Sequence, residues 1–191
     1  ELEVKRGMPA GHTRFIAMIE TADAFFRIHE IVHSCSRIVA CNIGGEDFAL
    51  DCNMQPSGEA LFYPKQHMII AANSAGIIPL GFIESVAGFG DWDNFRRMVR
   101  RSRDFGFMGA GCIHPGQVTI VNEEYTPGAE EVEYARKLIQ LDKEAAAAGR
   151  GSFSLDGKMI DIPVVVRAGK LLKRFNAIKA REARTLAPAK G

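Results

Sequence analysis

Short apolar runs recur along the chain and alternate with segments of helical spacing. Four such runs occupy residues 15–19, 38–43, 77–83 and 108–113. They are nearly continuous instead of alternating between apolar and polar residues, which is typical of strands buried on both faces of a sheet. Helices between consecutive strands imply right-handed βα units. The pattern therefore predicts an α/β fold with a parallel sheet.

Helices are expected between and after these strands. The expected ranges are residues 21–35, 65–74, 92–105 and 126–149. Thr21 is suited to the N-cap of the first helix, because its hydroxyl can accept a hydrogen bond from a free backbone N–H. Gly76 and Gly149 are suited to end the second and the last of these helices.

The C-terminal part of the chain has a different pattern. Asp156 and Gly157 form a dipeptide suited to a tight turn, so residues 152–161 predict a β-hairpin, and helical spacing resumes after it. We therefore divide the chain into residues 1–148, which form the main α/β part, and residues 149–191, an appended C-terminal segment.

Composition and charge narrow the classes of function. The 191 residues include 24 Lys and Arg against 23 Asp and Glu, and 47% are hydrophobic, as in a soluble globular protein. A net charge of +1 disfavours nucleic acid as a partner, because a nucleic-acid surface needs an excess of cations. No apolar run reaches the roughly 20 residues of a membrane helix, and no secretory leader is visible. We expect a cytoplasmic protein without membrane partners, and the missing initial Met indicates that residues precede Glu1.

Two strings match signatures of other classes and carry little weight. His29, Glu30 and His33 fit the HExxH pattern of zinc hydrolases, but the histidines lie at the edge of the apolar helix face and no third ligand follows. Residues 44–48 resemble a permuted signature of cyclic-dinucleotide synthases, without the upstream metal-binding aspartate. Both strings are better interpreted as ordinary structural residues.

A basic stretch lies within the third expected helix. Its arginines are Arg96, Arg97, Arg100, Arg101 and Arg103. We interpret them as a solvated helix face offset by Asp91, Asp93 and Asp104, not as a track for phosphates.

Carboxylates follow two of the expected strands. Glu20 comes directly after the first apolar run, and Asp47 follows the second. The carboxyl ends of parallel strands share one edge of a sheet, where ligands bind, so the two side chains are expected to lie near each other. Two carboxylates completed by water suit Mg²⁺. The alternative is that Glu20 and Asp47 cap the helices that follow them.

Five strings in order carry a resemblance to a known family. They are Ile19-Glu20-Thr21, Gly44-Gly45-Glu46-Asp47, the segment from Gly111 to Gln117 with His114 and Pro115, Thr126-Pro127, and the segment from Leu155 to Pro163 that contains Asp161. With these strings the chain resembles the HpcH/HpaI aldolase and citrate lyase beta-subunit family, most of all its CoA-ester lyases.

The resemblance implies a (β/α)₈ TIM barrel, of which this chain would cover strands five to eight plus a C-terminal lid. It implies that Glu20 and Asp47 bind Mg²⁺, and that Gly45, Glu46 and the rest of the loop contact the 2-oxo acid. Asp161 would be the catalytic acid/base residue, carried on the lid into a neighbouring subunit. The residues alone leave open that Asp161 caps the last helix.

The resemblance further implies a Mg²⁺-dependent carbon–carbon lyase. The enzyme would cleave a malyl-CoA or citramalyl-CoA type of thioester to an acyl-CoA, such as acetyl-CoA, and a 2-oxo acid. It would be a homo-oligomer, a trimer or hexamer, because the lid acts on a neighbour. The alternatives are a citrate lyase beta subunit acting on an acyl-carrier protein and, more distantly, a non-catalytic interaction module. The family's substrate-binding Arg would lie in a preceding half.

Overall fold

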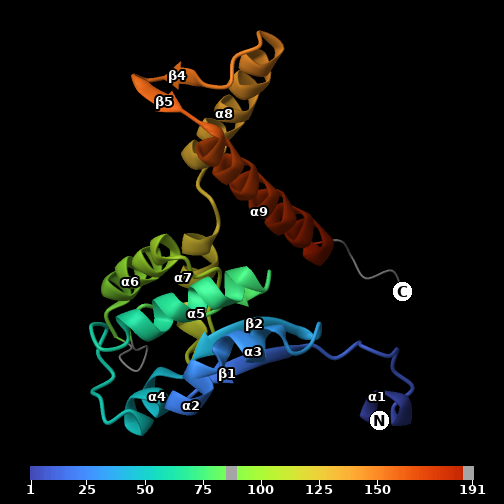
Figure 1. The fold of residues 1–191 in the computed structure, drawn as a ribbon, viewed down its shortest axis with the longest axis vertical. Helices are drawn as coiled ribbons and strands as arrows, with labels where there is room; N and C mark the ends of the chain where they lie inside the picture. Colours follow the sequence, from blue (N-terminus) through green and yellow to red (C-terminus); the bar gives the residue numbers. More distant parts are fainter. Residues whose placement is uncertain (85–89, 187–191) are drawn as a thin grey trace. The chain divides into compact units, whose positions relative to one another are not determined.

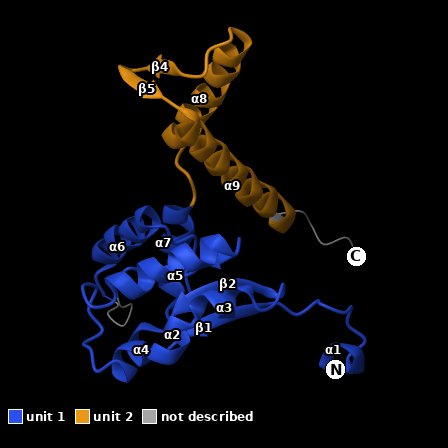
Figure 2. Cartoon of the chain, viewed as in Figure 1, with its two compact units in different colours: residues 1–125 blue, residues 126–191 orange. Residues whose placement is uncertain are grey.

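The computed structural model describes residues 1–84 and 90–186. They form two compact units, residues 1–125 and residues 126–191, which Figure 2 distinguishes by colour. We describe each unit by itself. The division into a main part and a lid at residues 148 and 149 concerns function and stays a prediction.

A parallel sheet forms the centre of the first unit. Its strands are β1 (Phe15–Ile19), β2 (Ile38–Ile43) and β3 (Ile78–Pro79), in the order β1-β2-β3, and both pairings are parallel. Ile19 at the end of β1 pairs with Ile43 at the end of β2. The predicted α/β class is therefore confirmed, and the carboxyl ends of β1 and β2 lie side by side.

The first expected helix is divided into α2 (Ala22–Phe26) and α3 (Ile28–His33). Thr21 is the N-cap of α2, and its hydroxyl accepts a hydrogen bond from the N–H of Ala24, as predicted. At Arg27 the helix tightens, because its N–H bonds to the carbonyl groups of both Asp23 and Ala24. Our expectation of one continuous helix was wrong at this point.

Helices pack against the sheet and enclose the core. A short α1 (Leu2–Lys5) precedes β1, α4 (Gly45–Asp51) follows β2, and α5 (Phe62–Ser74) connects to β3. Figure 1 shows α5 lying along β2, and α5 also contacts α3. Side chains buried between these elements include Ile19, Ile28, Cys41 and Met68.

The fourth strand, predicted at residues 108–113, is not formed as an extended strand. Within the described residues it contributes one parallel bridge, between Leu80 and Gly109, flanked by hydrogen bonds from the N–H of Gly81 and Met108. Glycine weakens a strand because it adds no side chain to the packing. Gly81 also turns the chain at a φ of 138°, where an added Cβ would lie 2.9 Å from the Phe107 ring.

Two helices complete the first unit. α6 (Trp92–Phe105) has the predicted bounds, and the side chain of Asp91 caps it by accepting from the N–H of Asn94. α7 (Pro115–Tyr125) was not predicted. Its start is fixed by Gln117, which is fully buried and whose Oε1 accepts from the N–H groups of Ile113 and His114.

The second unit is a helix, a hairpin and a helix. α8 (Ala129–Ala147) is followed by β4 (Phe153–Leu155), β5 (Lys158–Ile160) and α9 (Ile162–Leu186). The antiparallel hairpin turns at Asp156 and Gly157, which have positive φ values of 48° and 74°, so the predicted turn is confirmed. None of the described helices is long and apolar enough to cross a membrane.

Candidate functional site at the carboxyl ends of the strands

Glu20 follows β1 directly and lies against the start of the loop after β2. The N–H of Gly44 donates to the carbonyl of Ile19 at 2.9 Å, which holds the two strand ends together. A Cβ added at Gly44 would lie only 2.6 Å from both Cγ and Oε1 of Glu20. The Glu20 carboxylate therefore occupies space that is open only because residue 44 is glycine.

Gly45, Glu46 and Asp47 form the first turn of α4, directly beyond Gly44. Asp47 is exposed, and Glu20 is half-buried. Thr21 and Gly44 occupy the N-cap positions of α2 and α4, so neither Glu20 nor Asp47 caps a helix. The structure excludes the alternative that either carboxylate is an N-cap, whereas Asp47 lies in the first turn of α4, where a negative charge interacts favourably with the helix dipole.

The donor set fits a hard divalent cation. Glu20 and the turn that carries Asp47 meet at one edge of the sheet, and both supply carboxylate oxygens, the ligands that Mg²⁺ prefers together with water. The described residues contain no group of three or more His, Cys, Asp or Glu side chains placed to hold a metal. The site therefore suits a cation that keeps several waters, not a closed zinc centre.

A cavity of about 170 Å³ lies beside this edge. Its walls come from the end of β2, the segment after β3 and the first turn of α5; they include Asn42, Gly45, Leu61, Lys65, Leu80 and Glu84. Lys65 is only 5% exposed, and its Nζ donates to the carbonyl of Ile83 at 3.2 Å. Burial lowers the pKa of the Lys65 ammonium to about 8, although the charges of Glu84 and Glu46 oppose the shift.

The segment after β3 is fixed from α6. The N–H of Ile83 donates to the hydroxyl of Ser102, which is fully buried and donates in turn to the carbonyl of Met98. Glu84 pairs with Arg101 of α6 at 2.5 Å. These contacts hold the carbonyl of Ile83 where Lys65 reaches it.

Asp161 lies in the second unit, directly before α9. Its carbonyl accepts from the N–H groups of Val164 and Val165, and the residue is exposed. Asp161 therefore lies at the N-terminal boundary of α9, and the residue is exposed to solvent.

The histidines of the HExxH string lie on α3 and are exposed. Nδ1 of His33 lies 2.8 Å from the carbonyl oxygen of His29, and the ring centroids are 4.2 Å apart. The interpretation as ordinary surface histidines is consistent with this local contact.

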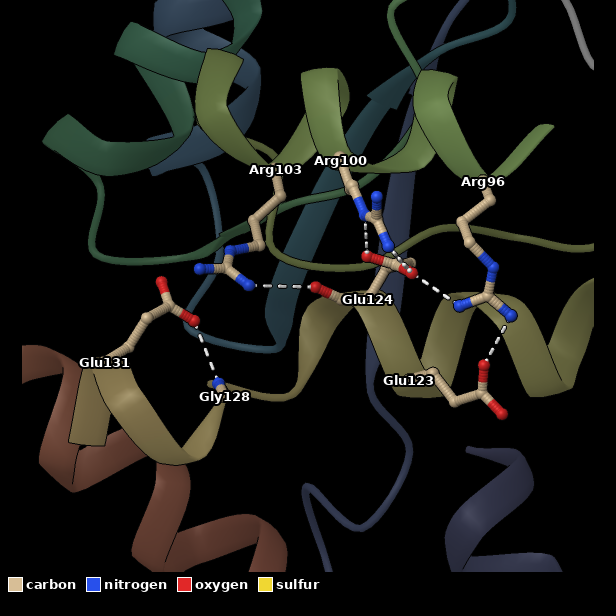
Figure 3. Close-up of polar contacts among 7 residues, drawn as sticks. All are labelled: Arg96, Arg100, Arg103, Glu123, Glu124, Gly128 and Glu131. Atoms are coloured by element: carbon tan, nitrogen blue, oxygen red, sulfur yellow. Dashed lines mark hydrogen bonds and ion pairs between the residues drawn. The ribbon is translucent and has the colours of Figure 1, made fainter. Parts of the chain in front are cut away.

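The arginines of α6 have partners other than those expected. Figure 3 shows Arg96 and Arg100 reaching from α6 to Glu124 of α7, with Arg96 also bonded to Glu123. Hydrogen bonds from Arg100 and Arg96 outweigh the effect of burial, so the pKa of the Glu124 carboxyl is lowered. For Arg96 and Arg100 the expected offset by aspartates near α6 was wrong, since their ion pairs join α6 to glutamates of α7.

Sequence reasoning missed Lys65 and Gln117. A detectable signal existed for Lys65, because it shares the helical spacing of the buried Leu61, Met68 and Ala72. A lysine in the middle of an apolar helix face is rarely buried without a specific contact. For Gln117 no periodic signal distinguishes the residue from a surface glutamine.

The fold and the site define an α/β protein with carboxylates and a cavity at the carboxyl ends of parallel strands. A family model described as HpcH/HpaI aldolase/citrate lyase matches residues 1–115. The chain belongs to this family.

Individual relatives agree with this assignment. The chain is 32% identical over 179 residues to the citrate lyase subunit beta of Leuconostoc mesenteroides subsp. cremoris, covering 93% of this chain and 59% of that subunit. It is 32% identical over 142 residues to the mitochondrial citramalyl-CoA lyase of Rattus norvegicus, covering 72% of this chain and 41% of that enzyme. The chain thus spans less than two thirds of the length of these relatives.

A solved structure shares the fold. The crystal structure of protein CitE from Mycobacterium tuberculosis in complex with magnesium, acetoacetate and coenzyme A matches with a TM-score of 0.72 and 24% identity. The match covers 85% of this chain and 61% of that one.

Proposed function

We propose that this chain is part of a Mg²⁺-dependent carbon–carbon lyase that cleaves a 3-hydroxyacyl thioester of the malyl-CoA or citramalyl-CoA type. The products would be an acyl-CoA, such as acetyl-CoA, and a 2-oxo acid. The observation that carries the proposal is the placement of Glu20 against Gly44, next to the turn with Asp47. The names of the relatives, which are citrate and citramalyl-CoA lyases, support the reaction class.

Each residue has a distinct role in this proposal. Glu20 and Asp47 hold Mg²⁺, which when bound acts as a Lewis acid toward the substrate oxygens. Gly45 and Glu46 belong to the loop that contacts the 2-oxo acid. The substrate hydroxyl group loses its proton to solvent and becomes the keto group of the 2-oxo acid, while the bond from its carbon to the thioester α-carbon breaks and the electron pair of that bond passes to the α-carbon. Asp161 delivers a proton to that α-carbon, which completes the acyl thioester.

We also propose that the parallel sheet belongs to a (β/α)₈ barrel and that the protein is a homo-oligomer whose lid acts on a neighbour. β1 is an edge strand in the described residues, and Phe15, Ile16 and Met18 on it are 49%, 58% and 54% exposed. Apolar side chains on an open edge are expected to be covered in the intact protein.

The metal role is tested by Glu20→Gln and Asp47→Asn in the intact protein. We expect the Mg²⁺ affinity to fall by more than the roughly 10- to 100-fold loss typical of changes outside the ligand shell. Turnover of malyl-, citramalyl- and citryl-thioesters should fall with it. The control is Asp23→Asn, which removes an exposed carboxylate on α2. Unchanged Mg²⁺ affinity in both test variants would refute the metal assignment.

The acid/base role is tested by Asp161→Asn. We expect a turnover loss of about 10²- to 10⁴-fold with unchanged Mg²⁺ affinity, because only proton transfer is removed. Asp156→Asn in the hairpin turn is the matched control, since Asn tolerates the positive φ there. An active Asp161→Asn enzyme would exclude this role.

One alternative differs in the acyl carrier. A citrate lyase beta subunit would act on a citryl group attached to an acyl-carrier protein, and the similarity to the Leuconostoc subunit favours it as the second candidate. An assay with free CoA thioesters and no carrier protein separates the two, because the subunit would be inactive without its carrier.

A further inference from the structure

Lys65 is a buried cation whose surroundings leave part of it unsatisfied. An ammonium group has three N–H donors, and one of them bonds to the carbonyl of Ile83. The carboxylates of Glu84 and Glu46 also line the cavity and act on the charge of Lys65, and Glu84 forms an ion pair with Arg101 of α6. The other two N–H groups are available to donate to a ligand in the cavity.

The position of Nζ places these donors beside the candidate site. Lys65 is on the wall of the cavity, and a Cβ added at Gly45 would lie 4.0 Å from Nζ. Gly45 is in the turn that carries Asp47. The ammonium therefore lies beside the first turn of α4, which carries one of the two proposed metal ligands.

A second polar group in the cavity lacks a partner. Oδ1 of Asn42, on β2, is buried and accepts no hydrogen bond from the described residues. Leaving a buried acceptor unpaired destabilises the fold, because the group loses its hydrogen bonds to water. Oδ1 of Asn42 can only accept a hydrogen bond and Nζ of Lys65 can only donate one, so the two groups suit different parts of a ligand that enters the cavity.

We propose that Lys65 binds a carboxylate group of the 2-oxo acid inside this cavity. The inference rests on the proposed function for the identity of the acid and adds a positioning residue that the strand-end carboxylates do not supply. A carboxylate offers oxygens to both remaining N–H groups of the ammonium, and charge-assisted hydrogen bonds of this kind are short and strong. With a pKa of about 8, Lys65 carries its charge for the most part at neutral pH.

Two substitutions separate the charge from the packing. Lys65→Met keeps the linear shape and removes all donors, and Lys65→Gln keeps an N–H donor within the side chain but removes the charge. Lys5→Met, on the exposed helix α1, is the matched control. Thermal unfolding of each variant shows whether the fold is retained, and Lys65→Gln serves if Lys65→Met does not fold.

The measurement is calorimetric binding of glyoxylate, pyruvate and oxaloacetate to the intact protein with Mg²⁺ present. We expect both Lys65 variants to bind about 10- to 100-fold more weakly than wild type, while Lys5→Met binds normally. A loss for all three acids identifies the carboxylate next to the keto group, and a loss confined to oxaloacetate identifies its second carboxylate. Unchanged affinities in both variants, or no binding of any acid to the wild type, would overturn the inference.

Mg²⁺ affinity and thioester turnover are measured on the same samples. If the wild type binds Mg²⁺ and cleaves thioesters but acid binding does not depend on Lys65, only the inference about Lys65 fails. If acid binding depends on Lys65 and no thioester is cleaved, the proposed lyase function fails and the carboxylate site stands.

Discussion

Gly44 shows how a single missing side chain can position a functional one. Its φ of −74° is open to any residue, so backbone conformation does not require glycine there. Space does, because a Cβ would overlap the Glu20 side chain. The glycine therefore acts through the space that it leaves for Glu20, not through the backbone.

We predict that Gly44→Ala weakens Mg²⁺ binding by about 10- to 100-fold, because Glu20 must move away from the added methyl group. Stability should change little, since the alanine restricts the unfolded chain and the clash involves a flexible side chain. Calorimetric titration with Mg²⁺ and a melting curve measure the two effects. Gly151→Ala is the control, as no heavy atom of the described residues lies within 4 Å of the Cβ added there. Equal Mg²⁺ affinities for the two variants would contradict this account.

The site was only partly accessible to sequence reasoning. The placement of Glu20 and Asp47 at one edge of the sheet could be predicted, because residues that end parallel strands meet there whatever the details of packing, and their role in binding a metal stays a prediction. Lys65 could not be assigned a role, because that depends on where α5 lies against the segment after β3. Its bond to the Ile83 carbonyl joins residues 18 positions apart, a contact that no local pattern encodes.

At the scale of helices and strands, local signals predicted the elements that they control. The cap at Thr21, the bounds of α6 and the turn at Asp156 follow from short-range chemistry and were confirmed. The prediction of a fourth strand was wrong, because apolar residues interrupted by glycines do not form a continuous ladder of hydrogen bonds with the neighbouring strand. α7 was missed because its start depends on the buried Gln117.

The contact between α6 and α7 depends on an ion-pair group. Glu124 has a side chain only 10% exposed, and it accepts hydrogen bonds from Arg96 and Arg100 (Figure 3). The backbone carbonyl of the same residue accepts from Arg103. One glutamate thus binds three arginines of the neighbouring helix.

We predict that Glu124→Gln lowers the free energy of unfolding by about 1–2 kcal/mol at pH 7, because two charge-assisted hydrogen bonds are weakened. The pKa of Glu124 is lowered in the folded state, so its ionised form stabilises the fold above the unfolded pKa of about 4.3. That contribution is lost as the pH falls through the folded pKa. The difference between wild type and variant should therefore shrink below about pH 4.

Urea unfolding monitored by Trp92 fluorescence measures this difference. Trp92 is the one tryptophan of the 191 residues, begins α6 and contacts the ring of His114 just before α7. Glu123→Gln is the control, because Glu123 is exposed and exposed ion pairs contribute less than about 1 kcal/mol. A stability difference for Glu124→Gln that stays constant from pH 7 to pH 3 would argue against the ionised carboxylate as its source.

At the scale of the whole molecule, the proposed chemistry is divided between the two compact units. Glu20 and Asp47 lie in residues 1–125, and Asp161 lies in residues 126–191. The sequence does not distinguish a lid that contributes Asp161 to the site of its own chain from a lid that contributes it to the site of a neighbouring chain. Only a test on assembled chains distinguishes the two arrangements.

Mixing two inactive variants provides this test. Asp47→Asn lacks a metal ligand and retains Asp161, whereas Asp161→Asn has the reverse defect. If the lid serves a neighbour and chains mix at random, about a quarter of the sites combine an intact metal pair with an intact Asp161, so we expect roughly a quarter of wild-type turnover after co-refolding or co-expression. If the lid serves its own chain, every site keeps one defect and the mixture stays as inactive as either variant. Wild-type chains mixed with the Asp47→Asn variant control for losses in assembly.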